Sequence, residues 1–281
     1  MKHYNTVLSI AGSDSGGGAG IQADIKTISA CGCYASTAIT AVTVQNTLGV
    51  AGVHPVPVEF VEGQIDAVLS DIGADAIKVG MLQSGEIVRC VVRMLKKYGC
   101  KNVVVDPVMV STSGHRLIEE AAMQSLRTEL LPLAAVITPN IPEAEILLDG
   151  KVLDKQANLY DAAKELGERY GTSVLLKAGH LTEEKLIDIF YNNVDGSITE
   201  LPSIRINTKN THGTGCTMSS ALASALAKGM SVVEAAKYAK NFINEAIIAG
   251  ADYEIGHGHG PVNHVKTLSP NLPHREGELC R

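Results

Sequence analysis

The chain has 281 residues, 45% of them hydrophobic, and a formal net charge of −6. This length is within the range of one α/β domain, and this apolar fraction can fill a large core, which excludes a disordered chain. No run of Lys or Arg is longer than Lys96-Lys97, so the charge offers no electrostatic footprint for nucleic acid or an anionic membrane. The expected partner is a small molecule.

The six cysteines show no framework spacing, and no signal peptide or long apolar stretch precedes the first predicted strand. These features predict a reduced, cytoplasmic protein of enzyme size.

Short runs rich in β-branched and aliphatic residues are the predicted strands. They are 6–12, 38–45, 76–81, 102–109, 134–140, 173–179 and 186–192. Their nearly continuous hydrophobicity is typical of strands that are covered on both faces. Amphipathic stretches such as 57–72 lie between them, so strands and helices alternate. This alternation predicts right-handed crossovers, a mainly parallel doubly wound sheet, and a ligand site beyond the carboxyl ends of its strands.

The last part of the chain is different, because two helices are expected to follow each other directly from Thr214. Ser231 and Glu234 have the spacing of a capping box at the start of the second helix, just after Gly229. No linker divides the chain. We therefore expect one domain over residues 1–265 and a C-terminal tail over residues 266–281.

A glycine-rich loop, "GSDSGGGAG", follows the first predicted strand. Its glycines allow backbone to approach a ligand, and Asp24 lies about one turn into the following helix. The spacing misses the dinucleotide fingerprint, and the Gly-Lys-Ser/Thr of a Walker A loop is absent. A flexible turn with a surface Asp is the alternative.

Polar side chains stand at the ends of several predicted strands. Gln45 offers an acceptor and two donors, which suits one edge of a heterocycle or an ordinary loop amide. Asp106 ends another strand. Asn140 and Glu143 could hold Mg²⁺ through water, or could be a helix N-cap with a first-turn acid.

Lys177 lies within an apolar strand, where its charge is costly unless it reaches an anionic partner such as phosphate. Gly213, Thr214, Gly215 and Cys216 present successive N–H groups at a helix start, a cradle for charge on a transferring phosphoryl group. The same field is expected to lower the pKa of the thiol. A buried, inert cysteine is the alternative.

Two further clusters are interpreted as structural. Cys31 and Cys33 do not fit a common zinc spacing and are expected in the core. His257, His259 and His264 lack a complementary acid or cysteine, so we expect a loop over the active site rather than a metal site.

Seven segments in order resemble one known family. They are "SIAGSDSGGGAGIQADIKT", "AVTVQNT", "IKVGM", "VVDPVMV", "TPNIPEAE", "VLLKAGH" and "THGTGCTMSSALA". Together they resemble the hydroxymethylpyrimidine/phosphomethylpyrimidine kinases of thiamin synthesis, a branch of the ribokinase-like superfamily. The resemblance implies a three-layer ribokinase-like α/β fold, with helices on both faces of a mostly parallel sheet. It also suggests a homodimer.

The resemblance implies that ATP phosphorylates 4-amino-5-hydroxymethyl-2-methylpyrimidine and then its monophosphate. Matching positions assign substrate contacts to Gln45, Asp24, Gly12, Val44, Met81 and Val108. They assign ATP contacts to Lys177, Asn140 and Thr211, and a Mg²⁺ and phosphate network to Asp106 and Glu143 together with Asn140. They assign the anion hole to Gly213, Thr214, Gly215 and Cys216, where Cys216 replaces the Asp base of most relatives.

Three other functions compete with this one. Pyridoxal kinases of the same branch use a similar heteroaromatic alcohol, but some of them carry a cysteine in the stretch after "DPVM", which here is "VSTSGHRL". A nicotinamide-dependent oxidoreductase lacks its fingerprint. A non-catalytic binding protein would not need both Lys177 and the glycine-cysteine loop.

Overall fold

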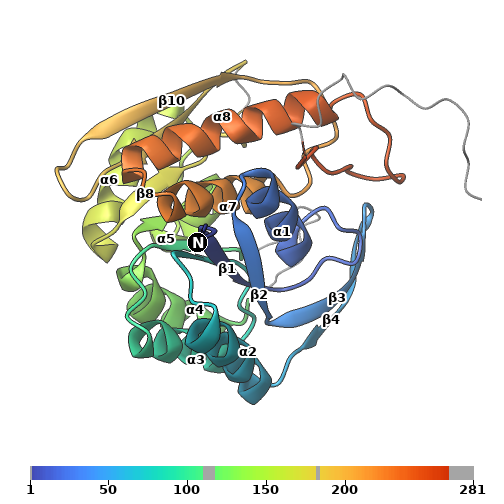
Figure 1. Cartoon of the computed structure of the whole chain (residues 1–281). Coiled ribbons are helices and arrows are strands. Elements are labelled where there is room, and N and C mark those ends of the chain that lie inside the picture. The colour runs from blue at the N-terminus through green and yellow to red at the C-terminus, as the bar shows by residue number, and fades with distance from the viewer. Residues whose placement is uncertain (1, 110–117, 182–183, 266–281) are drawn as a thin grey trace, which may run out of the picture.

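The computed structural model of the chain describes residues 2–109, 118–181 and 184–265. Within these ranges the central element is an eight-stranded sheet in the order β10-β9-β8-β7-β6-β5-β1-β2 (Figure 1). Its strands are β1 (Thr6–Ala11), β2 (Tyr34–Ile39), β5 (Ala76–Val79), β6 (Val103–Val105), β7 (Val136–Ile137), β8 (Ser173–Leu176), β9 (Lys185–Tyr191) and β10 (Ile198–Ile204). The six strands from β2 to β8 pair in parallel, and β9 and β10 continue the sheet antiparallel. The predicted mostly parallel sheet is confirmed.

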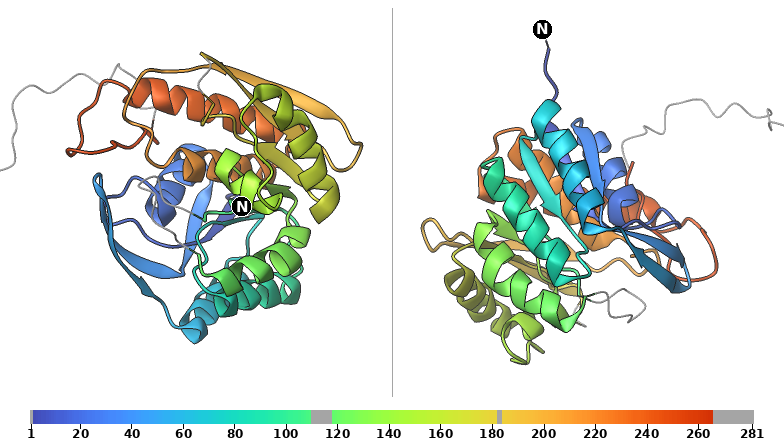
Figure 2. Two further views of the ribbon diagram at one scale, coloured as in Figure 1. Left: turned by 180° about the vertical axis from the view of Figure 1, so that it is seen from behind. Right: turned by 90° about the horizontal axis from the view of Figure 1, so that it is seen from below.

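Helices cover both faces of this sheet, as Figures 1 and 2 show. One face carries α1 (Gly20–Ala30), α7 (Thr214–Ala227) and α8 (Val232–Gly250). The other carries α2 (Val58–Asp71), α3 (Gly85–Lys97), α4 (Glu120–Ser125), α5 (Ile141–Leu147) and α6 (Gln156–Tyr170). Alternate strand residues supply the two cores, because successive side chains of a strand point to opposite faces. Val7 and Ala76 belong to the first core, and Leu8 and Ile77 belong to the second.

The predicted strand over 38–45 is wrong as one element. The chain turns at Thr40, which donates its N–H to Ala11 and its hydroxyl to the carbonyl of Met81. The next residues form β3 (Ala41–Asn46), which pairs antiparallel with β4 (Gly49–Pro55) as a separate hairpin that stands beside the main sheet (Figure 2). Burial alternates along β3, so only one of its faces is covered.

The predicted helix boundaries near the end of the chain are confirmed. Helix α7 starts at Thr214, and Ser231 and Glu234 form the predicted capping box at the start of α8. Across the described ranges, no helix is both long and apolar enough to span a membrane.

Candidate active site

A cavity of about 1000 Å³ opens along the carboxyl edge of the parallel strands. Its lining comes from the loops that follow β1, β5, β6, β7 and β8, together with the start of α7. This is the position that the alternation of strands and helices predicts.

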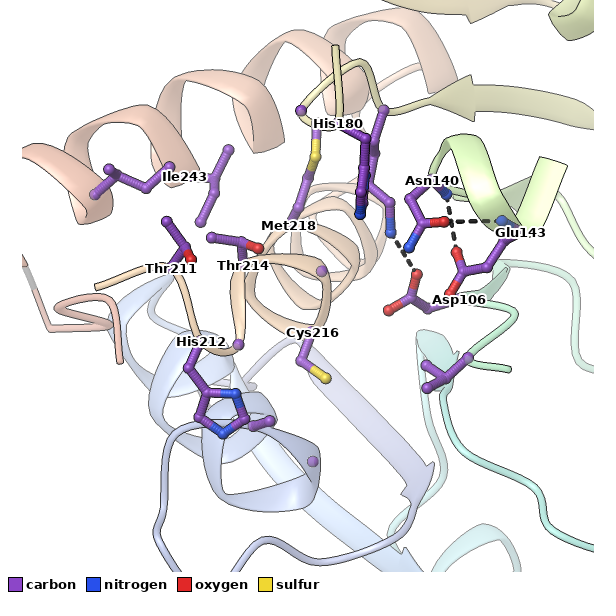
Figure 3. Close-up of a pocket in the computed structure, with 18 of the residues that line it drawn as sticks. Asp106, Asn140, Glu143, His180, Thr211, His212, Thr214, Cys216, Met218 and Ile243 are labelled. Atoms are coloured by element: carbon purple, nitrogen blue, oxygen red, sulfur yellow. Dashed lines mark hydrogen bonds and ion pairs between the residues drawn. The ribbon is translucent and has the colours of Figure 1, made fainter. Parts of the chain in front are cut away.

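Most of the predicted site residues line this one cavity. They are Gly12, Gln45, Met81, Asp106, Val108, Asn140, Glu143, Lys177, Thr211, Gly213, Thr214, Gly215 and Cys216. Figure 3 shows Cys216 between His212 on one side and the group of Asp106, Asn140 and Glu143 on the other.

Two predicted substrate residues are not part of the lining. Asp24 is fully buried rather than a surface acid, and its carboxylate is bonded to Lys78, Ser9 and Ser220. Val44 is 65% exposed on β3. For both, contact with a substrate stays a prediction.

The start of α7 has the geometry of an anion cradle. Gly213 adopts a φ of +82°, and a Cβ there would lie 1.8 Å from the carbonyl oxygen of Gly18. Only glycine therefore fits this contact between the two glycine-rich loops. The first turn leaves the N–H groups of Gly215 and Cys216 without partners from a preceding turn, so they are available to an anion.

Cys216 is partly exposed at this helix start. Burial raises the pKa of its thiol to about 11, and the carboxylates of Asp24 and Asp106 add to this, although Lys78 and a backbone hydrogen bond from Gly20 act in the opposite direction. The expectation of a lowered pKa is therefore wrong for the ligand-free protein. At neutral pH the sulfur is mostly a neutral thiol.

Lys177 and Asp106 form an ion pair on this edge, with 2.8 Å between Nζ and Oδ1. Thr138 donates its hydroxyl to the same carboxylate oxygen at 2.9 Å. Burial opposes ionisation, but the ammonium groups of Lys177 and Lys78 outweigh it and lower the pKa of Asp106. In the same way Asp106 and Glu143 overcome burial and raise the pKa of Lys177. Both groups are charged at neutral pH.

Asn140 and Glu143 form a complete capping box at the start of α5. The Asn140 side chain accepts from the Glu143 N–H at 2.9 Å, and Glu143 accepts from the Asn140 N–H at 2.8 Å. The structural interpretation of this pair is thus confirmed. Burial raises the pKa of Glu143 to about 7, and Asp106 contributes to the shift.

The same carboxylates also fit a divalent cation. Asp106 Oδ2 accepts no hydrogen bond from the described residues, although the side chain is almost fully buried. Mg²⁺ typically takes one or two carboxylates and completes its shell with waters and substrate phosphates. The described residues contain no group of three or more His, Cys, Asp or Glu that could hold a metal, so substrate and water would supply the other ligands.

Comparison with known proteins decides the family. The family model described as phosphomethylpyrimidine kinase matches residues 14–263. The chain belongs to this kinase family. A hydroxymethylpyrimidine/phosphomethylpyrimidine kinase of Rhizobium meliloti (strain 1021) is 46% identical over 257 residues, which are 92% of this chain and 96% of that protein.

Solved structures agree with this family and with its ribokinase-like fold. Phosphomethylpyrimidine kinase from Clostridium difficile 630 superposes with a TM-score of 0.75 at 42% identity, covering 86% of this chain and 99% of that one. An ADP complex of Bacillus subtilis pyridoxal kinase superposes with a TM-score of 0.86 at 37% identity, covering 93% and 98%.

Within this kinase site, sequence reasoning missed the pair of Asp14 and His212. His212 Nε2 lies 2.8 Å from Asp14 and 3.4 Å from the side-chain nitrogen of Gln45. Asp14 also accepts the N–H groups of Gly16, Gly18 and Ala19. Burial opposes these donors, but together they lower the pKa of Asp14. An Asp two residues before a glycine, as Asp14 is before Gly16, is typical of such turns, so this signal was present in the sequence.

The histidine-rich segment lies against the turn between β3 and β4 and against the glycine-rich loop after β1, and its histidines do not line the cavity. The His259 N–H donates to the carbonyl of Thr47, and His264 contacts the Gly18 carbonyl at 3.2 Å. Burial lowers the pKa of His264 to about 4, so it is a neutral, structural residue. Cys31 and Cys33 are buried in the core, as predicted.

Proposed function

We propose that this chain transfers the γ-phosphoryl group of ATP to 4-amino-5-hydroxymethyl-2-methylpyrimidine, and then to the resulting monophosphate, in thiamin biosynthesis. The observation on which this rests is that the anion cradle at the start of α7 shares one cavity with Lys177 and Gln45. Phosphoryl transfer requires positioning and charge neutralisation above all, and these residues supply both.

The phosphate half of the cavity follows from its charges. Lys177 would contact the ATP phosphates, and the N–H groups of Gly215 and Cys216 would receive the charge of the transferring group. Asn140 and Thr211 also line the cavity and would contact ATP. Bound through Asp106 and Glu143, Mg²⁺ would supply further neutralisation of phosphate charge.

The substrate half follows from shape and hydrogen bonding. Gln45 has both a donor and an acceptor, which match the amino group and a ring nitrogen of an aminopyrimidine. His212 restrains the side chain of Gln45 from one side. Gly12, Met81 and Val108 offer small or apolar surface for the flat ring.

In the first step the hydroxymethyl oxygen forms a bond to phosphorus, the bond from phosphorus to the ADP oxygen breaks, and the hydroxyl proton leaves. Cys216, at the start of α7, would receive that proton in its thiolate form. The transition state is loose, so little base strength is needed. In the second step the acceptor is a phosphate oxygen that is largely ionised at neutral pH.

The test is an ATP-consumption assay with four acceptors: the pyrimidine alcohol, its monophosphate, pyridoxal and pyridoxine. We expect turnover of the alcohol and of the monophosphate. Turnover of the monophosphate is decisive, because a simple vitamin kinase does not need to accept an existing phosphate. Reaction of the B6 vitamers alone would make the substrate assignment wrong.

A pyridoxal kinase is the second candidate, because the Bacillus subtilis enzyme superposes closely on this chain. The stretch that lacks the cysteine of some such kinases, residues 110–117, lies outside the described residues. Its sequence, with Ser111, Thr112 and Ser113, favours the pyrimidine. We therefore propose pyridoxal or pyridoxine phosphorylation only as a side activity.

We also propose a cytoplasmic homodimer in which residues 1–265 form one kinase domain. The hairpin exposes Val42, Val44 and Leu48, and α2 exposes Phe60, each more than half accessible. Exposed apolar surface of this kind favours association between copies. Light scattering should give the mass of two chains, and a Val42→Glu/Leu48→Glu variant should give the mass of one.

A further inference from the structure

A second lysine and aspartate pair lies beneath the cavity. Lys78 on β5 and Asp24 on α1 are both fully buried, and the ammonium nitrogen lies 2.9 Å from each carboxylate oxygen. Ser9 and Ser220 donate their hydroxyls to the same carboxylate at 2.6 and 2.8 Å. Asp24 therefore has partners for both oxygens and is fixed in place.

The pair is physically connected to the start of α7. Ser220 follows Cys216 by four residues, so the two lie on one face of the helix, one turn apart. Lys78 also contributes to the lining of the cavity. A Cβ at Gly80 would lie 2.8 Å from Lys78 Nζ, so the glycine leaves room for the ammonium group at this depth.

The ammonium group has more hydrogens than Asp24 can use. It carries three N–H donors, and among the described residues its hydrogen-bond partner is the Asp24 carboxylate, which offers two oxygens. A buried ion pair is weak evidence for stability, since apolar residues of similar volume are often as good. Both facts favour a role for Lys78 toward the cavity.

Charged groups around the cavity act on the Cys216 sulfur with opposite signs. Lys78 from β5 favours its ionised form, while Asp24 from α1 and Asp106 beyond β6 oppose it. Lys177 beyond β8 also interacts with the sulfur. Lys177 is paired with Asp106 and is proposed to meet ATP, whereas Lys78 keeps an N–H beyond its two contacts with Asp24.

We propose that Lys78, held by Asp24, is a positioning cation that stabilises the thiolate form of Cys216, the form that takes the hydroxyl proton. This inference rests on the proposed kinase function and gives Asp24 an indirect role through Lys78.

The test measures the reactivity of Cys216 in the ligand-free full chain, with iodoacetamide at one mildly alkaline pH. Only the thiolate reacts, and mass spectrometry of the peptide separates Cys216 from the other cysteines. Lys78→Gln removes the charge and keeps a donor for Asp24, whereas Lys78→Arg keeps the charge. We expect Lys78→Gln to raise the pKa of the Cys216 thiol by about one unit. The thiolate fraction then falls about tenfold, and the more basic thiolate recovers part of this loss by being more nucleophilic, so alkylation should slow by about fourfold or more. Lys78→Arg should stay within about twofold of the wild type.

Lys240→Gln is the matched control, because Lys240 forms another buried pair, with Asp188 at 2.7 Å, on α8 and β9. It should leave alkylation of Cys216 within about twofold. A change as large as that of Lys78→Gln, or an unchanged rate in Lys78→Gln itself, would overturn the proposal.

Circular dichroism checks that Lys78→Gln folds. If it does not, Asp24→Asn and Asp24→Asn/Lys78→Gln are compared, since these two differ only in the lysine. The double variant should react more slowly, and equal rates would overturn the proposal. Alkylation is measured without ATP or acceptor. The proposal for Lys78 can therefore fail while the acceptor assay supports the kinase function, and the proposal can hold while the acceptor assay fails.

Discussion

Two buried lysine and aspartate pairs stand near the same cysteine, and they differ in their access to the cavity. Lys78 and Asp24 have no exposed side-chain surface, whereas Lys177 retains 14% and Asp106 retains 3%. Their ion-pair distances are almost the same, 2.9 and 2.8 Å. The chemistry of a pair therefore does not decide its role. Depth does, because a phosphate can reach the exposed part of Lys177, whereas Lys78 has no exposed side-chain surface.

The largest expected effect concerns stability. Lys78→Met leaves Asp24 buried without its cation and should lower the free energy of unfolding by about 3 to 5 kcal/mol. Lys177→Met should cost clearly less, because water can solvate Asp106 from the cavity. Urea unfolding of both variants measures the difference. Equal losses would mean that depth does not distinguish the two pairs.

Loss of the accessible lysine should affect ATP use most. Lys177→Ala removes a charged donor from the phosphates and should lower kcat/KM for ATP on the order of 10²- to 10³-fold. Steady-state kinetics with ATP varied measure this, and Lys96→Ala, an exposed lysine on α3, is the control. Unchanged ATP kinetics would remove Lys177 from the phosphate site.

Cys216 interacts electrostatically with both pairs and should matter more for one acceptor than for the other. Cys216→Ala should lower kcat for the pyrimidine alcohol by about 10²-fold or more, the usual range for a lost general base. The loss should be smaller for the monophosphate, whose acceptor oxygen is already ionised. Parallel assays with the two acceptors test this. Near-normal turnover of the alcohol would exclude Cys216 from the mechanism.

The smallest expected effect is a pH dependence near the accessible pair. Burial raises the pKa of Glu143 from 4.5 to about 7, so the folded state binds its proton more tightly than the unfolded state. Below pH 4.5 the Glu143 carboxyl is protonated in both states, so its burial destabilises the folded state least there. The free energy of unfolding then falls as the pH rises toward about 7. Glu143→Gln should remove roughly 2.5 kcal/mol of this dependence between pH 4.5 and about 7.

Denaturant unfolding of wild type and Glu143→Gln across this pH range, with chelator and without nucleotide, gives the difference between them. His264 titrates with the opposite sign in part of the range, but it is common to both proteins and cancels. Parallel pH profiles would contradict the raised pKa of Glu143.

The sequence predicted those strands of the sheet that are buried on both faces. Strands β1, β5 and β8 are covered on both faces, and their apolar runs predicted them. The break at Thr40 depends on hydrogen bonds to Ala11 and Met81, which are distant in sequence. Strand β10 alternates polar and apolar residues and was missed.

The sequence predicted which residues line the site better than it predicted which of them bond to one another. The polar groups at strand ends do meet in one cavity, as parallel topology requires. The spacing of Asn140 and Glu143 suited a capping box and a cation site equally, and only the structure showed the cap. The partnership of Asp24 with Lys78, 54 positions away, left no local pattern. For that reason neither the burial of Asp24 nor the raised pKa of Cys216 could be anticipated.

The contact between the Gly18 carbonyl and Gly213 has a consequence for the order in which the protein matures. The two loops come from opposite ends of the chain, and the tight approach leaves no space for even a methyl group. During synthesis the strands from β1 to β10 have all emerged before Gly213 does. The anion cradle is therefore made only after the last strand, so a nascent chain that ends at β10 cannot catalyse phosphoryl transfer.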